Sequence, residues 1–448
     1  MSSLQSHNPL TRSDKPSQQT SPPDTPHVDT FPQETEGIQN LKLADSERID
    51  EDAEPLVAVI GCGYVGTQLI GSFSTKYDVL GFDVSKEQLR RVELEHGGES
   101  SRATFSLDPR DLARATHFLI SVPTLLKADK TIDTSYVRSA LTNVRKYARP
   151  GSTVVIESSV AIGMTRQLLG PLAEEKGFFA GMSPERVDPG RTEPPMKEIP
   201  KVLSGLDDVV PGSLNAITRL YSRVFDTIVP VSSPETAEMT KLYENCQRMI
   251  AISYANEMAD ACVGHGIDPY EVCRAAATKP FGYTPFTPGL GVGGHCIPVN
   301  PYYLIANSEF PLLKHATETM WQRPEKIGHR ALEVLFQDRP KSIDSGDKSR
   351  PRVLVVGVGF KAGQSHLSNS PGLRLIQTLA DSGRVDVMFA DALVEQSAIP
   401  HIPRLSMDEW NKETLDGFDM IIVAFKQTDM DFKVLEAVEH ARVEMWCP

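Results

Sequence analysis

Short apolar runs alternate with helical stretches through the first part of the chain. The runs made mostly of apolar side chains are residues 56–60, 78–83, 117–122 and 152–157. Such runs are typical of strands that are buried on both faces of a parallel sheet. The intervening segments, such as 67–75, have the pattern of helices. This alternation predicts a doubly wound parallel α/β sheet over residues 55–211.

The pattern changes between residues 212 and 337, where helical periodicity replaces the short apolar runs. The longest helix is predicted over residues 234–264, and a Gly/Pro-rich loop over 278–301 interrupts the helical region. A polar stretch at 338–351 predicts a linker. After it, apolar runs begin again at 352–359, 385–391 and 420–425. The predicted fold class is therefore α/β, with two Rossmann-like doubly wound parallel-sheet domains, 55–211 and 352–448, joined by a central helical region.

The charge of the chain is concentrated in its first residues. The 448 residues carry a formal net charge of -13, and residues 1–54 hold 11 acidic and 4 basic side chains together with six prolines. This composition predicts a disordered acidic tail, which is either an inert extension or a segment that binds a partner. A globally acidic chain is a poor candidate for binding nucleic acid or an anionic membrane surface.

The lack of a recognisable targeting signal and the spacing of the cysteines predict a cytoplasmic protein. The sequence has no apolar run long enough for a transmembrane helix and no hydrophobic signal core at its start. None of its six cysteines forms a C-x-x-C pair, so neither a metal site nor a redox dithiol is expected. Reduced thiols are the expectation for such a chain.

The first predicted strand leads into a glycine turn of the form G-x-G-x-x-G. The first glycine permits the tight bend, the second lets a pyrophosphate approach the backbone, and the third lets the helix pack against the strand. Asp83 ends the second strand, where a carboxylate binds ribose hydroxyls and repels a 2′-phosphate. Together these features predict an NAD site, with a purely structural turn as the alternative. The predicted cofactor contacts are Gly61, Gly63, Tyr64, Val65, Gly66, Asp83, Pro123, Thr124 and Glu157.

Cys296 follows several glycines in the loop over residues 278–301. Glycines leave backbone N–H groups room to face a substrate, so Cys296 is a candidate nucleophile, with an inert buried cysteine as the alternative. Lys241 and Asn245 share one face of the long helix. A cation beside an amide donor can stabilise an oxyanion, although spacing alone favours a solvated helix face.

Two further segments carry polar side chains at the expected edge of the first sheet. Glu157 and Ser159 lie where a strand closes, and Glu185 lies in a turn over residues 182–190. Active sites of open α/β sheets lie at this edge. Ordinary loop chemistry is the alternative for both segments.

Taken together, these segments resemble the nucleotide-sugar 6-dehydrogenases of the UDP-glucose/GDP-mannose dehydrogenase family. The resemblance covers about residues 56–425 and is most specific at 277–282 and at 291–304. The His-Cys-Ile-Pro sequence at Cys296 is similar to the branch that oxidises UDP-N-acetylglucosamine or UDP-N-acetylmannosamine. The resemblance implies an NAD-dependent four-electron oxidation of the C6 hydroxymethyl group to a uronic acid, through a thiohemiacetal and a thioester on Cys296.

The same resemblance implies roles for individual residues. Lys241 and Asn245 match a pair that steadies the C6 oxygen, Glu185 matches a carboxylate for hydrolysis or proton transfer, and Ser159 falls where a threonine usually lies near a catalytic water. The implied substrate contacts are Phe286, Gly289, Gly293, Gly294, Phe360 and Lys361. A UDP-sugar is the expected substrate, and a homodimer or a higher homo-oligomer built on the central helix is the expected assembly.

Two departures from the family pattern keep other functions open. Asn300, counted here among the catalytic positions, stands where the family has an aspartate, and an amide cannot take up a proton. The segment after Lys361 keeps only Ser370 and Pro371 of the usual pattern. The alternatives are a UDP-glucose 6-dehydrogenase and a catalytically impaired homologue that binds NAD or a nucleotide sugar.

Overall fold

A computed structural model describes residues 54–98, 100–188, 190–191, 193–337 and 350–448. The predicted acidic tail, apart from Glu54, lies outside the described residues, and so does the predicted linker over 338–349. None of the helices in the described part of the chain has the length and hydropathy of a transmembrane segment.

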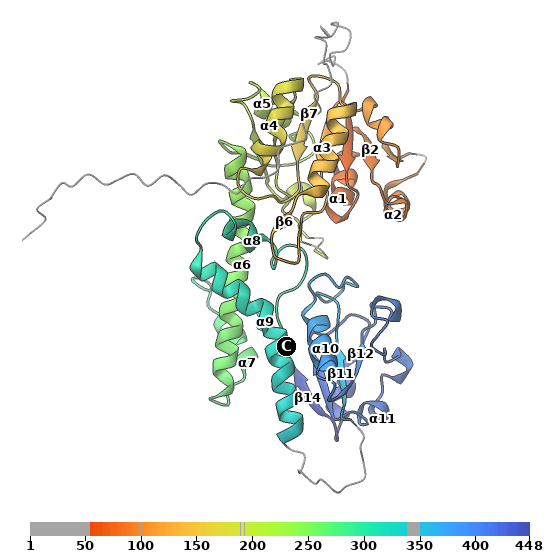
Figure 1. Cartoon of the computed structure of the whole chain (residues 1–448), viewed down its shortest axis with the longest axis vertical. Helices are drawn as coiled ribbons and strands as arrows, with labels where there is room; N and C mark the ends of the chain where they lie inside the picture. Colours follow the sequence, from red (N-terminus) through yellow and green to blue (C-terminus); the bar gives the residue numbers. More distant parts are fainter. Residues whose placement is uncertain (1–53, 99, 189, 192, 338–349) are drawn as a thin grey trace, which may run out of the picture. The chain divides into compact units, whose positions relative to one another are not determined.

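Within the described residues, an eight-stranded sheet forms the first half of the fold, in the order β10-β9-β8-β7-β4-β1-β2-β3 (Figure 1). The strands from β3 to β8 in this order are parallel, and their arrangement is the 3-2-1-4-5-6 order of a dinucleotide-binding fold. These strands are β1 (Leu56–Ile60), β2 (Asp78–Phe82), β3 (Ala103–Ser106), β4 (His117–Ile120), β7 (Thr153–Ile156) and β8 (Phe179–Met182).

Two further strands extend this sheet in a way that the sequence pattern did not indicate. Strand β9 (Lys201–Gly205) pairs antiparallel with β8, and β10 (Ile228–Pro230) pairs parallel with β9. Helix α5 (Ser213–Tyr221) packs on β8 and β9. The sheet is therefore mixed at this edge, and residues 213–230 join the first half instead of the helical region.

Alternation along the central strands divides the core of the first half into two layers. Val57 and Val59 face one buried cluster with side chains of α1 and α5, while Ala58 and Ile60 face another with side chains of α3 and α4. Burying each valine or isoleucine side chain contributes about 1.5–3 kcal/mol. The helices of this half are α1 (Tyr64–Phe73), α2 (Lys86–His96), α3 (Ser135–Tyr147), α4 (Met164–Lys176) and α5.

The part of the chain after residue 350 forms a second sheet of four parallel strands, in the order β12-β11-β13-β14. Val353 and Val355 face one cluster and Leu354 and Val356 face the other, so this sheet is also buried on both faces. Together with the first half, it confirms the prediction of two Rossmann-like α/β units. Its elements are β11 (Arg352–Val356), α10 (Pro371–Asp381), β12 (Asp386–Ala390), α11 (Lys412–Leu415), β13 (Met420–Val423) and β14 (Arg442–Met445).

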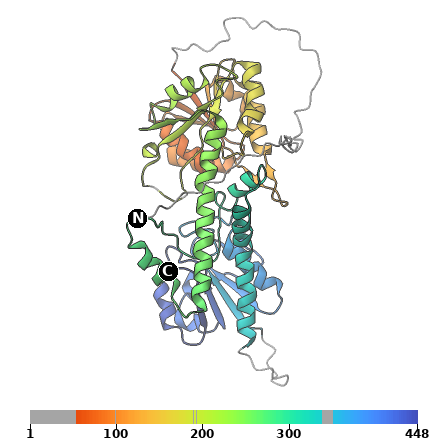
Figure 2. The same ribbon diagram turned by 90° about the vertical axis from the view of Figure 1, so that its left-hand side faces the viewer.

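Two long helices that pack against each other form most of the region between the sheets (Figure 2). They are α6 (Pro234–Val263), drawn in green, and α9 (Pro311–Gln337). Helix α10 of the second half packs on α9. A cluster around Leu242, Met249 and Tyr303 joins α6 to α8 and α9. The shorter elements are the hairpin β5 (Leu125–Leu126) and β6 (Ile132–Asp133), α7 (Pro269–Ala277) and α8 (Asn300–Ile305).

A buried carboxyl group ties α6 to the first half. Glu238 on α6 is 1% exposed, and its two oxygens accept hydrogen bonds from Gly163 N at 2.6 Å and from Thr165 N at 2.8 Å. These are otherwise unpaired N–H groups in the first turn of α4. Burial raises the pKa of Glu238 to about 7, although the N–H groups of Thr165 and Gly163 oppose the rise.

Replacing Glu238 by leucine should destabilise the protein by about 2–4 kcal/mol, because two buried N–H groups would lose their acceptors. Chemical denaturation followed by circular dichroism measures the difference. Glu235→Leu, one turn earlier on α6, is the matched control. It removes a partly exposed ion pair with Arg166 and should cost less than about 1 kcal/mol. Equal losses in the two variants would contradict this account of Glu238.

Candidate functional site

The glycine turn after β1 has the geometry of a phosphate-binding turn. A Cβ on Gly66 would lie 1.9 Å from Gly61 O, and one on Gly61, whose φ is 92°, would lie 2.9 Å from Ser121 O. A Cβ on Gly63 would meet nothing within 4 Å, so the space above the turn is open. Gly63 is the N-cap of α1 and has no side chain that could accept hydrogen bonds from the first turn of the helix. The N–H groups of that turn therefore remain available to a ligand in this space. The turn therefore fits the pyrophosphate of NAD.

Asp83 lies at the end of β2, beside the glycine turn. Its carboxylate accepts hydrogen bonds from Cys62 N and from Ser85 N, both at 2.8 Å. These bonds orient the carboxylate and link it to the turn. A ribose could then be recognised through the lone pairs that the two backbone bonds leave unused.

One cavity of about 1080 Å³ gathers residues from both sheets and from the central helices. It exceeds the ~300–1,000 Å³ typical of a pocket for one ligand, so a cofactor and a substrate could occupy it together. The predicted residues on its wall are Gly63, Tyr64, Val65, Pro123, Thr124, Glu157, Ser159, Glu185, Lys241, Asn245, Gly289, Gly293, Gly294, Cys296, Asn300, Phe360 and Lys361. The predicted residues outside its wall are Gly61, Gly66, Asp83 and Phe286.

Phe286 lies on the loop after α7, and the Sγ of Cys273 on that helix approaches its carbonyl oxygen at 3.9 Å. The structure thus does not support Phe286 as a cavity residue. The loop first reaches the cavity at Thr287.

One face of α6 carries four polar residues of the cavity, which are Lys241, Glu244, Asn245 and Arg248. Lys241 and Asn245 are 7% and 4% exposed, so they are not part of a solvated helix face. Arg248, three residues further along the same face, also lies on the wall. Among the described residues, the ammonium of Lys241 has no carboxylate within ion-pairing distance. Its charge therefore remains directed at the cavity.

The cysteine loop is held against the second half of the fold. Gly294 N donates to Ser368 O at 2.8 Å, and Asn369 Nδ2 donates to Gly294 O at 2.9 Å. The His295 ring nitrogen Nε2 lies 2.7 Å from Ser368 Oγ, and burial lowers the pKa of His295. These bonds fix the backbone immediately before Cys296.

Asn300 links the cysteine loop to α6. Its backbone N–H donates to Cys296 O at 2.9 Å, and its side-chain Oδ1 accepts a hydrogen bond from Asn245 Nδ2 at 2.6 Å. Asn300 is 2% exposed. One of the two N–H groups of the Asn245 amide is thereby used inside the protein, and the other remains for a ligand.

Glu185 is held from two sides. Its Oε1 accepts from Arg186 N at 2.5 Å and from Val187 N at 2.7 Å, while its Oε2 lies 3.3 Å from Lys201 Nζ. The guanidinium of Arg186 donates to Glu244 on α6 at 2.6 Å. This ion pair sets the loop that carries Glu185 against the helix that carries Lys241 and Asn245.

Glu157 differs from its predicted role as a cofactor contact. It contributes to the cavity wall, but it is 0% exposed, and its carboxylate binds Lys201 Nζ at 2.7 Å and accepts from the hydroxyl of Tyr221. The carboxylate therefore belongs to a buried ion cluster. The apolar run before Glu157 gave no indication of this, because its partners come from β9 and α5.

Position and burial together separate Cys296 from the other cysteines of the fold, since Cys262 and Cys273 are also partly exposed but lie outside the cavity wall. Burial raises the pKa of Cys62 and of Cys246 to about 12, so both thiols stay protonated and inert. Cys296 lies on the cavity wall and is partly exposed. Cys447 is also on the wall, but burial raises the pKa of its thiol as well. Cys296 is the better candidate nucleophile.

The NAD-binding-domain model of the UDP-glucose/GDP-mannose dehydrogenase family matches residues 56–225, and the central-domain model of the same family matches residues 235–320. The chain belongs to the UDP-glucose/GDP-mannose dehydrogenase family. The predicted NAD-dependent nucleotide-sugar dehydrogenase, with NAD as its cofactor, is thereby confirmed at the level of the family.

Individual relatives span most of the chain. A UDP-N-acetyl-D-glucosamine 6-dehydrogenase of Pseudomonas aeruginosa is 33% identical in an alignment of 362 positions, which covers 74% of this chain and 82% of that protein. A UDP-N-acetyl-D-mannosamine dehydrogenase of Pyrococcus horikoshii is 29% identical in an alignment of 394 positions, which covers 82% of this chain and 88% of that protein. The activities in these two names are those of the branch that the His-Cys-Ile-Pro sequence resembles.

Solved structures of the family share the fold. The structure of a UDP-D-ManNAc dehydrogenase from Pyrococcus horikoshii matches with a TM-score of 0.75 and 26% identity, covering 87% of this chain and 95% of that one. The structure of a UDP-glucose dehydrogenase from Pyrobaculum islandicum matches with a TM-score of 0.74 and 21% identity, covering 89% of this chain and 96% of that one. The second likeness concerns the fold alone.

Several residues of the site escaped the sequence reasoning. Arg248 follows Lys241 and Asn245 at helical spacing, so the same periodicity argument could have found it. Asp188 lies on the wall 3.3 Å from Lys361 Nζ and 3.9 Å from Arg248, and no local pattern pointed to it. Among the described residues, no group of three or more His, Cys, Asp or Glu side chains could hold a metal ion.

Replacing Gly294 by alanine should lower kcat by roughly 10- to 100-fold, because the added Cβ would lie 3.0 Å from the ring of Phe360 and displace the loop before Cys296. Steady-state NADH formation measures the change. Gly151→Ala is the control for backbone strain, since Gly151 has a φ of 79° but nothing within 4 Å of an added Cβ. Its kcat should stay within about twofold of wild type. Equal kcat in the two variants would refute the role of this contact.

Proposed function

We propose that the protein oxidises the C6 hydroxymethyl group of a UDP-N-acetylhexosamine to a carboxylate, with Cys296 as covalent nucleophile. One observation supports this proposal above the others. Cys296, Lys241, Asn245 and Glu185 come from distant segments of the sequence and line the same cavity. A protein that only bound nucleotides would have no need of a nucleophile, an ammonium and a carboxylate at one site.

The cysteine accounts for an oxidation that passes beyond the aldehyde. When bound, NAD accepts the hydride that leaves C6 in each of two oxidation steps. The thiolate of Cys296 adds to the carbonyl carbon of the aldehyde, and a thiohemiacetal results. Loss of the second hydride leaves a thioester on Cys296. Water then adds to the thioester carbonyl, the C–S bond breaks, and the carboxylate product and the free thiolate separate.

Lys241 and Asn245 are proposed to stabilise the C6 oxygen when it bears negative charge. A buried ammonium and an amide N–H act strongly on a developing oxyanion because they are already oriented in a water-poor site. Lys241 is 7% exposed, which supports this role. Glu185 is proposed to take the proton of the attacking water. Ser159, on the cavity wall, is proposed to hold that water.

The two ligands are proposed to bind at opposite sides of the cavity. NAD would lie against Gly63, Tyr64 and Val65, and the nucleotide sugar against Phe360 and Lys361 of the second half. We accordingly propose an NAD-binding domain that extends from residue 55 to residue 230, because α5 and β10 join its sheet, followed by a central helical domain up to residue 337 and a UDP-sugar-binding domain over 352–448. The N-acetylhexosamine is proposed on the basis of the named relatives and of the His-Cys-Ile-Pro sequence.

The assembly and the location are also proposals. Helix α6 exposes Tyr243, Tyr254 and Met258 at 70%, 60% and 48%, and such apolar exposure supports a homodimer or higher homo-oligomer through this helix. A reactive thiolate needs a reducing compartment, which supports a cytoplasmic location.

Incubation with NAD and a UDP-N-acetylhexosamine should yield two NADH per sugar, because the alcohol and then the thiohemiacetal each lose one hydride. Absorbance at the NADH band, together with chromatography of the sugar product, measures the ratio. UDP-glucose is run in parallel and should react more slowly. A single burst of NADH with an adduct trapped on Cys296 would indicate an impaired homologue, and no NADH with any UDP-sugar would refute the enzymatic function.

Replacing Asn300 by aspartate should speed the hydrolytic step several-fold, because it supplies a carboxylate that can take up a proton beside Cys296. The carboxylate can still accept the hydrogen bond from Asn245 Nδ2, so the local fold is conserved. Rapid-quench measurement of thioester decay separates this step from the oxidations. Unchanged or slower decay would contradict the importance of the missing carboxylate.

A further inference from the structure

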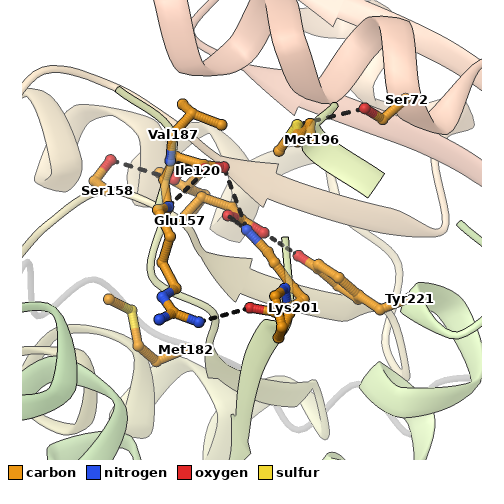
Figure 3. A network of polar contacts seen from close by, with 12 residues as sticks. Ser72, Ile120, Glu157, Ser158, Met182, Val187, Met196, Lys201 and Tyr221 are labelled. Atoms are coloured by element: carbon orange, nitrogen blue, oxygen red, sulfur yellow. Dashed lines mark hydrogen bonds and ion pairs between the residues drawn. The ribbon is translucent and has the colours of Figure 1, made fainter. Parts of the chain in front are cut away.

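A buried ion cluster lies directly behind Glu185. Lys201, the first residue of β9, is 3% exposed, and its Nζ lies 2.7 Å from Glu157 Oε2 (Figure 3). The same Nζ lies 3.3 Å from Glu185 Oε2. Glu157 and Glu185 are 0% and 6% exposed. The hydroxyl of Tyr221 donates to the other oxygen of Glu157. The cluster thus joins the ends of β7 and β8 through a side chain of the antiparallel strand β9.

The cluster contains two carboxylates and one ammonium. Burial alone would lower the pKa of Lys201, but the two carboxylates reverse this, and its pKa is raised. Burial raises the pKa of Glu157 and of Tyr221. With Lys201 and both glutamates ionised, the cluster carries a net charge of about -1.

Lys201 is absent from the cavity wall, whereas Glu185 lies on it. The ammonium therefore cannot contact a ligand and can act only through its neighbours. Stability alone does not explain such a cluster, because a buried ion pair often contributes less than apolar side chains of similar size. Glu185 is the member of the cluster that lies on the cavity wall, and its other oxygen accepts hydrogen bonds from the backbone of Arg186 and Val187. The cluster can therefore affect a reaction in the cavity through Glu185.

We propose that Lys201 is a positioning residue for thioester hydrolysis, whose ammonium orients Glu185 Oε2 and supplies the positive charge that balances this carboxylate at the cavity wall. This inference rests on the proposed function, in which Glu185 takes the proton of the attacking water. In that step the water oxygen bonds to the thioester carbon, its proton moves to Glu185, and the sulfur of Cys296 leaves with the C–S electron pair. Lys201 exchanges no proton and only fixes the acceptor.

The cluster predicts the direction in which each substitution moves the pH dependence. The titratable and charged groups near Lys201 and Glu185, from all elements packed around them, are Glu157, Tyr221, Tyr64, Arg186 and Glu244. Removing the ammonium leaves two carboxylates without a counterion, so the pair takes up a proton more readily. Removing the charge of Glu157 leaves the ammonium of Lys201 to balance one carboxylate instead of two, so the acid limb of the kcat profile should move to lower pH.

The experiment compares Lys201→Met, Lys201→Arg, Glu157→Gln and the double variant Lys201→Met/Glu157→Gln in the full-length protein. The pH profiles of kcat and KM are recorded with NAD and a UDP-N-acetylhexosamine, with quenched samples examined for an adduct on Cys296. For Lys201→Met we expect the acid limb of kcat to move up by about 1–3 pH units. At pH 7, kcat should fall roughly 10- to 100-fold, with an adduct on Cys296 and KM within about twofold.

The other variants test charge against structure. Glu157→Gln should move the acid limb to lower pH, and the double variant should return it toward wild type because one carboxylate is lost together with the ammonium. Lys201→Arg should keep most of the activity. The control is Lys197→Met, which replaces an exposed lysine four residues before Lys201, and its kcat and pH profile should match those of wild type.

The outcomes separate this inference from the function on which it rests. Two NADH per sugar from wild type, with an acid limb that does not move in Lys201→Met or Glu157→Gln, would overturn the role of Lys201 alone. A double variant no better than Lys201→Met, with kcat losses that follow Tm, would also overturn it. If Lys201→Met does not fold, the Glu157→Gln variant tests the inference by itself: an acid limb at lower pH supports the role of Lys201, and an unmoved limb overturns it. No NADH and no adduct in wild type would overturn the proposed function itself, and this inference with it.

Discussion

The hydrogen bonds between Glu238 and the first turn of α4 connect the two kinds of structure on which the site depends. The edge of the first sheet supplies the turns after β1, β4, β7 and β8, whereas α6 supplies Lys241, Asn245 and Arg248. Parallel strands place their carboxyl ends at one edge automatically, but nothing in a Rossmann half fixes a separate helix over that edge. Glu238, one turn before Lys241, fixes α6 over this edge through its hydrogen bonds to α4. The ion pair between Arg186 and Glu244 makes a second connection, about one turn after Lys241.

The net charge of -13 says little about this cavity. More than half of this net charge, -7 of -13, belongs to residues 1–54, of which only Glu54 is described. The cations on the wall are Arg91, Arg186, Lys241, Arg248 and Lys361, and the acids are Glu95, Glu157, Glu185, Asp188 and Glu244. Pairing consumes much of this charge, since Arg186 binds Glu244 while Arg248 and Lys361 approach Asp188. Local pairing, and not the sum of charges, therefore decides which cation is available to an anionic ligand. Lys241 and Arg91 have no carboxylate partner among the described residues, and of the two only Lys241 is buried.

Local patterns predicted those parts of the site that depend on local structure. The glycine turn needs only a strand, a turn and a helix in succession. Helical periodicity placed Lys241 and Asn245 on one face of α6, but spacing alone favoured a solvated face, and only the family resemblance implied a role for the pair. Strand β9 and its Lys201 could not be found in this way, because an antiparallel strand added beyond β8 is determined by packing against α5. The ion cluster around Glu157 could not be predicted for the same reason, since its partners Lys201 and Tyr221 are distant in sequence. The position of Phe286 outside the cavity wall likewise depends on a contact between its loop and α7, which no local pattern reveals.

Asn300 shows how the two proposals depend on each other. An amide at this position keeps the hydrogen bond to Asn245 and the backbone bond to Cys296, so the geometry around the nucleophile does not require a carboxylate. The neutrality of this amide removes a proton acceptor from the neighbourhood of Cys296, so in the proposed mechanism hydrolysis would depend on Glu185. A chain that relies on one carboxylate for that step gains most from holding it in one orientation, and the cluster formed by Lys201, Glu157 and Tyr221 provides such a constraint.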